Sequence, residues 1–282
     1  MNNCLVTKLK ASVNDDSLLK LGEIKLTIAP TSESKTLAIA STESIIVEIV
    51  KAISGNGTFS WSGGTNVSKA TIPPILDSYY TLTFSEGEYI VSISNKYAIT
   101  RIESNDSLNV LDLNGDLSYS EELFSLVLSV KNFTNNNISQ FGNLPIVKFN
   151  TSSNNNLKGS INSFSNLTSI SSINLNASED NDKIYGNISA FSLSKNIERC
   201  QLSRCLNIEG NINVFNSSIK LAYLDVYHTK VIGDIDALAQ AQIAAGRTTG
   251  SLWINSSKLT NAGTPFTSVK TITFSNGSYT IS

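Results

Sequence analysis

The sequence predicts a mainly β protein. We expect an N-terminal antiparallel β domain, residues 1–105, followed by a parallel β-solenoid, residues 106–282, with one short inserted helix. Three observations support this fold class. Apolar and polar residues alternate in short segments of the first part, an apolar pattern recurs at a roughly constant interval in the second part, and one alanine-rich run interrupts that recurrence.

Short alternating segments fill residues 1–105. They are rich in Ile, Val, Tyr, Phe and Trp, and glycine turns separate them, as expected for an antiparallel sheet or sandwich. The expected strands are 24–28, 45–49, 59–61, 80–84 and 89–93, with turns at 55–57 and 63–64 and one helical turn at 15–22. Polar residues at 103–107 mark the predicted boundary. No flexible linker is visible there, so we expect the two domains to dock rigidly.

The pattern apolar-x-x-apolar-x-apolar recurs through the second part. Because successive strand side chains point to opposite faces, the last two apolar residues enter a core while the residue between them faces solvent. One unit cannot close a core, but parallel stacking buries each apolar column against its neighbours. The copies are Leu108/Leu111/Leu113, Leu123/Leu126/Leu128, Leu144/Val147/Phe149, Ile170/Ile173/Leu175, Ile197/Cys200/Leu202, Leu221/Leu224/Val226, Val269/Ile272/Phe274 and a weaker Thr249/Leu252/Ile254.

A second motif, Gly-x-Ile-x-x-Phe or Leu, alternates with the first. Its clear copies begin at Gly159, Gly186, Gly210 and Gly233. The same number of residues separates its Ile from the middle apolar residue of the next strand in three cases, 161 to 173, 188 to 200 and 212 to 224. The glycine is expected to allow a turn, or a close approach of coils that a Cβ would obstruct.

One stretch breaks the period and predicts the inserted helix. The run 236–245, Asp-Ala-Leu-Ala-Gln-Ala-Gln-Ile-Ala-Ala, combines an Asp able to cap with good helix formers, and Gly246 follows its end. We expect this helix to thicken the convex side near the C-terminal end. The last apolar copy and Tyr279-Thr280-Ile281 are expected to cover the open end of the core.

With these residues the second part resembles leucine-rich repeats, which implies a solenoid of that type. The family's consensus continues with Asn or Cys three residues after the last strand Leu. Here that place holds Asp116, Lys131, Ser152, Ser178, Cys205, Thr229, Ser257 and Gly277, so the usual Asn is absent from the alignment. The Gly-x-Ile phase is also similar to the Gly-x-Ile-Pro repeats of plant receptors, without the proline.

Two N-terminal segments resemble proteins of Bacteroidetes-infecting bacteriophages, the crAss-like group among them. They are 3–10, Asn-Cys-Leu-Val-Thr-Lys-Leu-Lys, and 88–97, Glu-Tyr-Ile-Val-Ser-Ile-Ser-Asn-Lys-Tyr. The resemblance implies a head or tail fibre-like virion protein, made in the bacterial host cytoplasm. Its N-terminal domain would anchor to other virion proteins, its repeats would point outward, and it would form a homo-oligomer.

Charge and composition limit the partners. With Lys+Arg 21 and Asp+Glu 23 the formal net charge is −2, so no basic excess is available to hold phosphates, and nucleic acid is not expected. No run approaches the ~18 apolar residues of a membrane span. The first residues lack the pattern of a secretory signal. The three cysteines, an odd count at no metal or redox spacing, argue against a disulfide framework.

No constellation of residues predicts catalysis, a cofactor or a metal. The single histidine, His228, has no nucleophile motif nearby and is interpreted as a surface residue. Cys200 and Cys205 are interpreted as packing residues of the repeats. The acidic run 179–182 lacks the glycine and the distal glutamate of a calcium loop and is interpreted as a solvated turn. The chain is therefore expected to be non-enzymatic, with no cofactor.

The solvent side of the repeat strands carries the candidate binding surface. Aligning the repeats places Tyr223 beside Ser251, and Asp225 beside Trp253, in neighbouring columns. Tyr, Trp and Arg are enriched at binding hot spots, and aromatics with amides also suit sugar rings. The predicted surface consists of Arg199, Gln201, Tyr223, Asp225, Tyr227 and Trp253, and it would take a host cell-surface glycan or protein, or another virion protein.

Two other functions remain open from the sequence. The chain could be a bacterial leucine-rich-repeat adhesin or interaction module unconnected with virions. It could also be a glycan-active enzyme on a solenoid, since such a fold can bring distant carboxylates together, although no motif recommends a pair.

Overall fold

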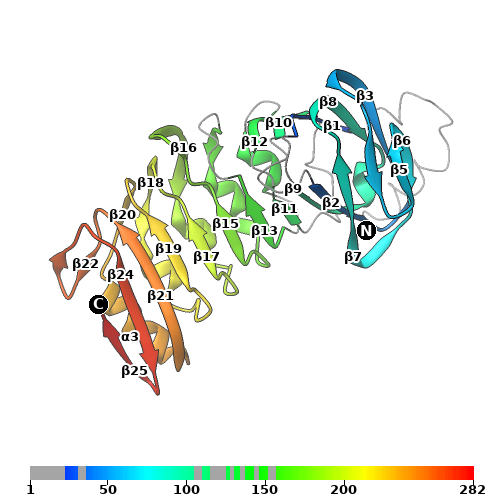
Figure 1. The fold of residues 1–282 in the computed structure, drawn as a ribbon. Coiled ribbons are helices and arrows are strands. Elements are labelled where there is room, and N and C mark those ends of the chain that lie inside the picture. Colours follow the sequence, from blue (N-terminus) through cyan, green and yellow to red (C-terminus); the bar gives the residue numbers. More distant parts are fainter. Residues whose placement is uncertain are drawn as a thin grey trace, which may run out of the picture.

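The computed structural model describes residues 23–30, 36–104, 110–114, 125–127, 130–133, 137–142, 146–151 and 157–282. The protein is mainly β, with an N-terminal antiparallel sheet and a long mixed sheet that contains consecutive parallel strands (Figure 1). The helical turn predicted at 15–22 and the segment 3–10 lie outside the described residues. Within those residues no helix is long and apolar enough to cross a membrane.

The N-terminal region is built from two sheets that share one buried core. All five strands and both turns expected there are present, because alternation and glycine turns are strong local signals. Strands β2, β5, β6 and β9 were not foreseen. One sheet has the order β12 (Val130–Phe133), β10 (Val110–Asn114), β1 (Ile24–Ile28), β8 (Gly87–Ile93), β3 (Ile45–Gly55) and β6 (Lys69–Ile72). The other begins with β5 (Gly64–Val67), β4 (Phe59–Trp61), β7 (Ile75–Phe84), β2 (Thr36–Ser41) and β9 (Ile99–Ser104), with η1 (Lys96–Ala98) just before β9.

The second of these sheets continues without a break into the repeats. Beyond β9 it adds the parallel strands β11 (Ser125–Val127), β13 (Lys148–Asn150), β15 (Ser172–Asn174), β17 (Arg199–Gln201), β19 (Tyr223–Val226) and β21 (Thr249–Ser256) (Figure 1). Since β9 pairs with β11, the two predicted domains share a sheet across residue 105, and the boundary itself stays a prediction.

One column of inward-facing side chains shows how these strands stack. Each of its members pairs with the next in register, and each is 0% exposed. Burial of such a column stabilises the stack through continuous apolar contact. The column is Ile102, Leu126, Phe149, Ile173, Cys200, Leu224 and Ile254.

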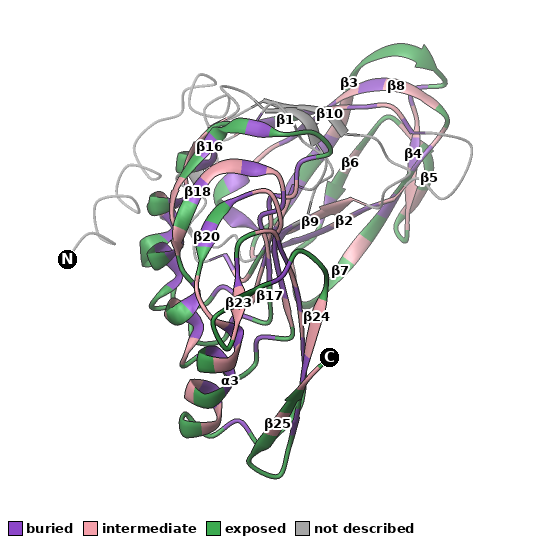
Figure 2. Ribbon diagram, turned by 90° about the vertical axis from the view of Figure 1, so that its left-hand side faces the viewer, coloured by how far each residue is buried: buried purple, intermediate pink, exposed green. Residues whose placement is uncertain are grey.

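Between the strands of the long sheet, the repeat segments, which we call coils, contribute a second parallel sheet of short strands and a row of short helices. The second parallel sheet consists of β14 (Gly159–Ser160), β16 (Asn181–Asn187), β18 (Cys205–Asn211) and β20 (Lys230–Ile232). The helices are η4 (Ile138–Phe141), η5 (Ile161–Asn166), η6 (Ile188–Phe191), η7 (Ile212–Phe215) and α3 (Ile235–Ala244). Figure 2 shows them stacked along one side of the molecule, with α3 at the end.

The Gly-x-Ile motif marks the entry into these helices. The residue between Gly and Ile is the N-cap, and in the last three coils Asn187, Asn211 and Asp234 accept a backbone N–H two residues ahead. The preceding glycine has a positive φ, +121° at Gly210, and a Cβ there would lie 2.6 Å from the Asn187 Oδ1 of the previous coil. The expected close approach of coils is therefore confirmed, whereas Gly159, Gly186 and Gly210 lie within short strands and not in turns.

The predicted helix is confirmed, with a different cap. The N-cap of α3 lies two residues earlier than expected, at Asp234, whose Oδ1 accepts the backbone N–H groups of Asp236 and Ala237. The carboxylate also accepts from Thr260 and Gly263. Asp236, which we expected to cap, stands in the first turn.

Four repeat copies differ from the sequence alignment. Phe149, not Val147, takes the core place beside Leu126, and Ile254, not Leu252, pairs with Leu224. Leu111 and Leu113 of the first copy lie on β10 in the other sheet, and Leu108 lies outside the described residues. The last copy is β24 (Lys270–Ser275), which runs antiparallel to β21 and forms a hairpin with β25 (Ser278–Ile281). A shorter hairpin, β22 (Thr260–Asn261) and β23 (Thr264–Pro265), lies nearby. An antiparallel hairpin ends the parallel stack, so these strands extend the long sheet beyond its last coil.

The place that the alignment gave to Ser178 is held by Asn181. The register pairs Asn181 with Cys205, and its side chain is buried, with Nδ2 donating to the Leu157 carbonyl of the previous coil at 3.1 Å. Cys205 makes the same kind of contact, from Sγ to the Leu175 carbonyl at 3.4 Å. The expectation that the Asn is missing throughout was wrong, because the turn before β16 is longer than in the other coils.

Candidate functional site

Three of the predicted surface residues form a continuous stack, which we call the ladder: Arg199, Tyr223 and Trp253. The guanidinium carbon of Arg199 lies 4.6 Å from the centroid of the Tyr223 ring. The rings of Tyr223 and Trp253 are stacked, with centroids 4.2 Å apart and planes 13° from parallel. The ladder therefore crosses three neighbouring strands of the long sheet, β17, β19 and β21.

Strand register explains why these side chains meet. Arg199 pairs with Tyr223, and Tyr223 with Trp253, while the residues that follow them, Cys200 and Leu224 among them, point into the core. Parallel strands lie about 4.8 Å apart, which suits ring stacking. The alignment that placed Trp253 beside Asp225 was wrong by two residues, because the coil containing α3 is longer and shifts the strand register.

Asp225 lies in the next column and is not an open contact residue. Its side chain is 6% exposed, and it accepts hydrogen bonds from Asn176 Nδ2 at 3.4 Å, from Asn255 Nδ2 at 3.2 Å and from the Tyr227 backbone N–H at 3.3 Å. Burial raises the pKa of Asp225 above its ordinary value, and these hydrogen bonds offset only part of that effect. The residue holds neighbouring coils together beneath the surface.

An Asp225→Asn variant is expected to change how stability depends on pH. Because the folded pKa is raised above 3.8, the folded state holds the proton more tightly than the unfolded state. The wild type therefore loses stability as the pH rises from 3.8 through the raised pKa. The variant lacks this proton, so its stability relative to the wild type should increase across that window. Urea unfolding of both proteins from acidic to neutral pH measures it, and parallel pH curves would contradict the expectation.

The other two predicted residues border the ladder. Gln201 pairs with Asp225 in the same column and is half-buried. Tyr227 lies at the corner where the strand ends, and its ring stacks on His228 with centroids 4.1 Å apart. His228 Nδ1 lies 3.2 Å from Asp180 Oδ1, which also lies 3.6 Å from Arg204. These contacts describe a surface corner, in agreement with the interpretation of His228.

The cysteines are packed inside the coils. Cys200 and Cys205 are fully buried free thiols. Burial, with a smaller contribution from Asp225, raises the pKa of Cys200 above the usual range and that of Cys205 to about 12. Both thiols therefore stay protonated and unreactive at neutral pH. In the described part of the chain, no three His, Cys, Asp or Glu side chains are grouped so that they could hold a metal ion.

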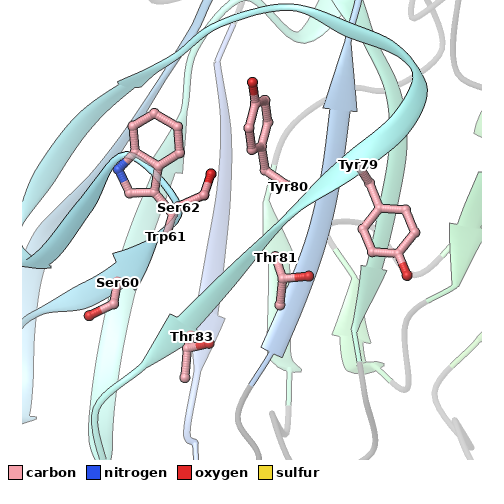
Figure 3. Close-up of a pocket in the computed structure, with 7 residues that line it drawn as sticks. All are labelled: Ser60, Trp61, Ser62, Tyr79, Tyr80, Thr81 and Thr83. Atoms are coloured by element: carbon pink, nitrogen blue, oxygen red, sulfur yellow. The ribbon is translucent and has the colours of Figure 1, made fainter.

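A groove at the other end of the long sheet escaped the sequence analysis. It is shallow, measures about 440 Å³ and lies on β4 and β7 (Figure 3). Its aromatic residues are Trp61, Tyr79 and Tyr80, and its hydroxyl residues are Ser60, Ser62, Thr81 and Thr83. The two strands are separated in the sequence and meet only through pairs such as Ser60 with Thr83. No short motif could have revealed it.

No protein-family model matches the chain, and no curated protein matches it.

Proposed function

We propose that the protein is a non-enzymatic, fibre-like structural component of a bacteriophage virion, in which the ladder mediates attachment or contacts with other virion proteins. The virion assignment is supported by the resemblance of segments 3–10 and 88–97 to proteins of Bacteroidetes-infecting phages. In this proposal the N-terminal domain anchors to the particle, the repeats point outward, and copies associate as a homo-oligomer. The chain is made in the host cytoplasm and assembled there.

We further propose that the coils form a solenoid of leucine-rich-repeat type. In-register parallel strands with a fully buried apolar column support this proposal. Asn181 and Cys205 donate to carbonyls of the preceding coils. They resemble the column of Asn or Cys residues found in that family. Thr229 stands one coil further along, bonded within its own turn to the Val226 carbonyl.

The single observation that carries the binding proposal is the continuous stacking of the ladder side chains. Both faces of the Tyr223 ring are occupied, one by Arg199 and the other by Trp253. Side chains that are already fixed lose little conformational entropy when a partner binds, and Tyr, Trp and Arg dominate binding hot spots. Since both Tyr223 faces are taken, a partner meets the edge of this ring, which favours a protein surface over a sugar ring stacked on Tyr223.

Attachment assays with purified protein test the ladder. The double variant Tyr223→Ala, Trp253→Ala is expected to weaken binding to host cells or to purified particles by about tenfold or more, because it removes two anchors. Tyr185→Ala is the matched control, since this tyrosine is 52% exposed on β16, outside the long sheet. Equal binding by all three proteins would remove the ladder from the proposal.

The virion assignment has its own test. Mass spectrometry of purified phage particles should find this chain in stoichiometric amounts. Its absence from the particles would overturn the assignment and would favour an adhesin made by a bacterium.

A further inference from the structure

We propose that the groove on β4 and β7 is a binding site for a neutral carbohydrate. The groove lies on the first part of the long sheet, far along the strand order from the ladder, so this inference does not depend on the proposed function.

Tyr79 provides the exposed aromatic surface of the groove, which we call the platform. Its side chain is 47% exposed, and the guanidinium carbon of Arg101 lies 5.0 Å from its ring centroid. The strand order β9-β2-β7-β4 places Arg101 on one side of Tyr79 and the groove strand β4 on the other. The cation therefore holds the ring from one side and leaves exposed ring surface for a ligand. The electron-rich face of an aromatic ring attracts the weakly positive C–H face of a sugar.

Hydroxyl groups line the groove on the β4 side of Tyr79. Tyr79 and Tyr80 follow each other on β7 and point to opposite sides of the strand, with Trp61 on the side of Tyr80 (Figure 3). Strand alternation places Thr81 and Thr83 on the side of Tyr79. Their hydroxyls can each donate and accept hydrogen bonds, which matches the hydroxyls of a sugar.

The charge of the groove selects among ligands. None of its lining residues is Asp, Glu, Lys or Arg. Arg101, beside the groove, lies 3.6 Å from the carboxylate of Glu103 and stacks on Tyr79. A lining of hydroxyls and aromatic rings offers no ion pair, so a neutral glycan fits better than an acidic one.

Trp61 is fixed in place before any ligand arrives. A Cβ on Gly63 would lie 2.4 Å from the Trp61 Cη2, so the indole packs directly on this turn. The Tyr80 ring meets it edge-on, with centroids 5.4 Å apart and planes at 86°. Trp61 and Tyr80 therefore form a fixed edge of the groove, on the side of β7 opposite Tyr79, and an edge that is already ordered reduces the entropy lost on binding. The glycine turn that the sequence predicted at 63–64 thus shapes one end of the groove.

Affinity electrophoresis in native gels tests the site. The full chain is run in gels that contain a glucan, mannan, xylan or galactan, and at least one of these polysaccharides should retard it. Tyr79→Ala should weaken that retardation about tenfold. Thr81→Val, a milder change, should weaken it less, and Tyr185→Ala should leave it unchanged. Retardation by none of the four polysaccharides overturns the proposal.

The two tryptophans locate the binding event. The chain contains only Trp61 and Trp253. In a Trp253→Phe variant, Trp61 is the single emitter, and the retarding polysaccharide should shift or quench its fluorescence. If retardation disappears in Tyr223→Ala but persists in Tyr79→Ala, the sugar binds at the ladder and the groove proposal fails. Failure of the groove proposal would leave the proposed attachment through the ladder unchanged, because the double variant at Tyr223 and Trp253 tests that proposal separately.

Discussion

A Gly210→Ala variant is expected to unfold at a much lower urea concentration than the wild type. Gly210 has a φ of +121°, a conformation that L-residues rarely adopt, and the new Cβ would lie 2.6 Å from Asn187 Oδ1 and 2.8 Å from Ile188 Cγ1. The coils must separate or the backbone must twist. Backbone strain and overpacking together should cost about 3 kcal/mol of unfolding free energy.

A Gly246→Ala variant separates the contribution of backbone strain from that of overpacking. Gly246 also has a positive φ, +100°, but nothing lies within 4 Å of its ideal Cβ. This variant should show strain alone, about 1 kcal/mol. Equal destabilisation of the two variants would mean that the close approach between coils does not limit residue 210.

Replacing Arg247 with methionine is expected to destabilise the C-terminal coils by about 3 kcal/mol. The guanidinium is 5% exposed and donates to the carbonyl of Leu221 at 2.6 Å, to Gln242 Oε1 at 2.8 Å and to the carbonyl of Ser251 at 3.0 Å. It joins the previous coil, α3 and β21. Methionine fills similar space but removes the donor from all three acceptors, of which the Leu221 carbonyl and Gln242 Oε1 are buried.

Arg247→Lys distinguishes charge from geometry. Lysine keeps the positive charge but lacks the planar fork that reaches three acceptors at once. It should therefore be nearly as damaging as methionine. Arg199→Met, at an exposed position, is the control for loss of an arginine. Wild-type stability in Arg247→Lys would contradict this account of the residue.

The repeat could be predicted because its core positions are chemically uniform. Ile173, Cys200 and Leu224 are equivalent apolar residues at nearly equal intervals, and the structure pairs them as expected. The Gly-x-Ile motif could be recognised equally well. The position before each helix needs a positive φ and has no space for a Cβ, so glycine recurs there. Local turn chemistry and period are properties that the sequence expresses directly.

Register was harder to predict where loop lengths change. The longer turn before Asn181 shifts the alignment, so Ser178 was assigned the place that Asn181 holds. The inserted α3 shifts it again, so Leu252 was assigned the place of Ile254. Ile102 was not recognised as a member of the core column because it follows the antiparallel strands in sequence. A pattern search cannot see strand pairing that crosses a predicted domain boundary.

The contacts within the candidate surface were predicted in part, and its role in binding stays a prediction. Arg199, Tyr223 and Trp253 were placed on the same side of the repeat strands, yet their order in the stack needed the true register. The burial of Asp225 depends on Asn176 and Asn255, which come from two different coils, and no local pattern expresses it. The groove was missed for the same reason, since strand pairing alone assembles it.

Spin-label distances test the stacking of coils most directly. Ser139, Ser189 and Asn213 are the second residues of η4, η6 and η7, and all three are exposed. They can be changed to cysteine in pairs and labelled, with Cys4 replaced by serine. Cys200 and Cys205 should stay unlabelled because they are buried and protonated.

The stacked arrangement predicts a fixed order of distances. Positions 139 and 189 are two coils apart, and positions 139 and 213 are three coils apart. The second distance should exceed the first in a ratio near three to two, with each coil adding at least about 4.8 Å. If the 139–213 distance were equal to or shorter than the 139–189 distance, the coils would not be successive layers around one core.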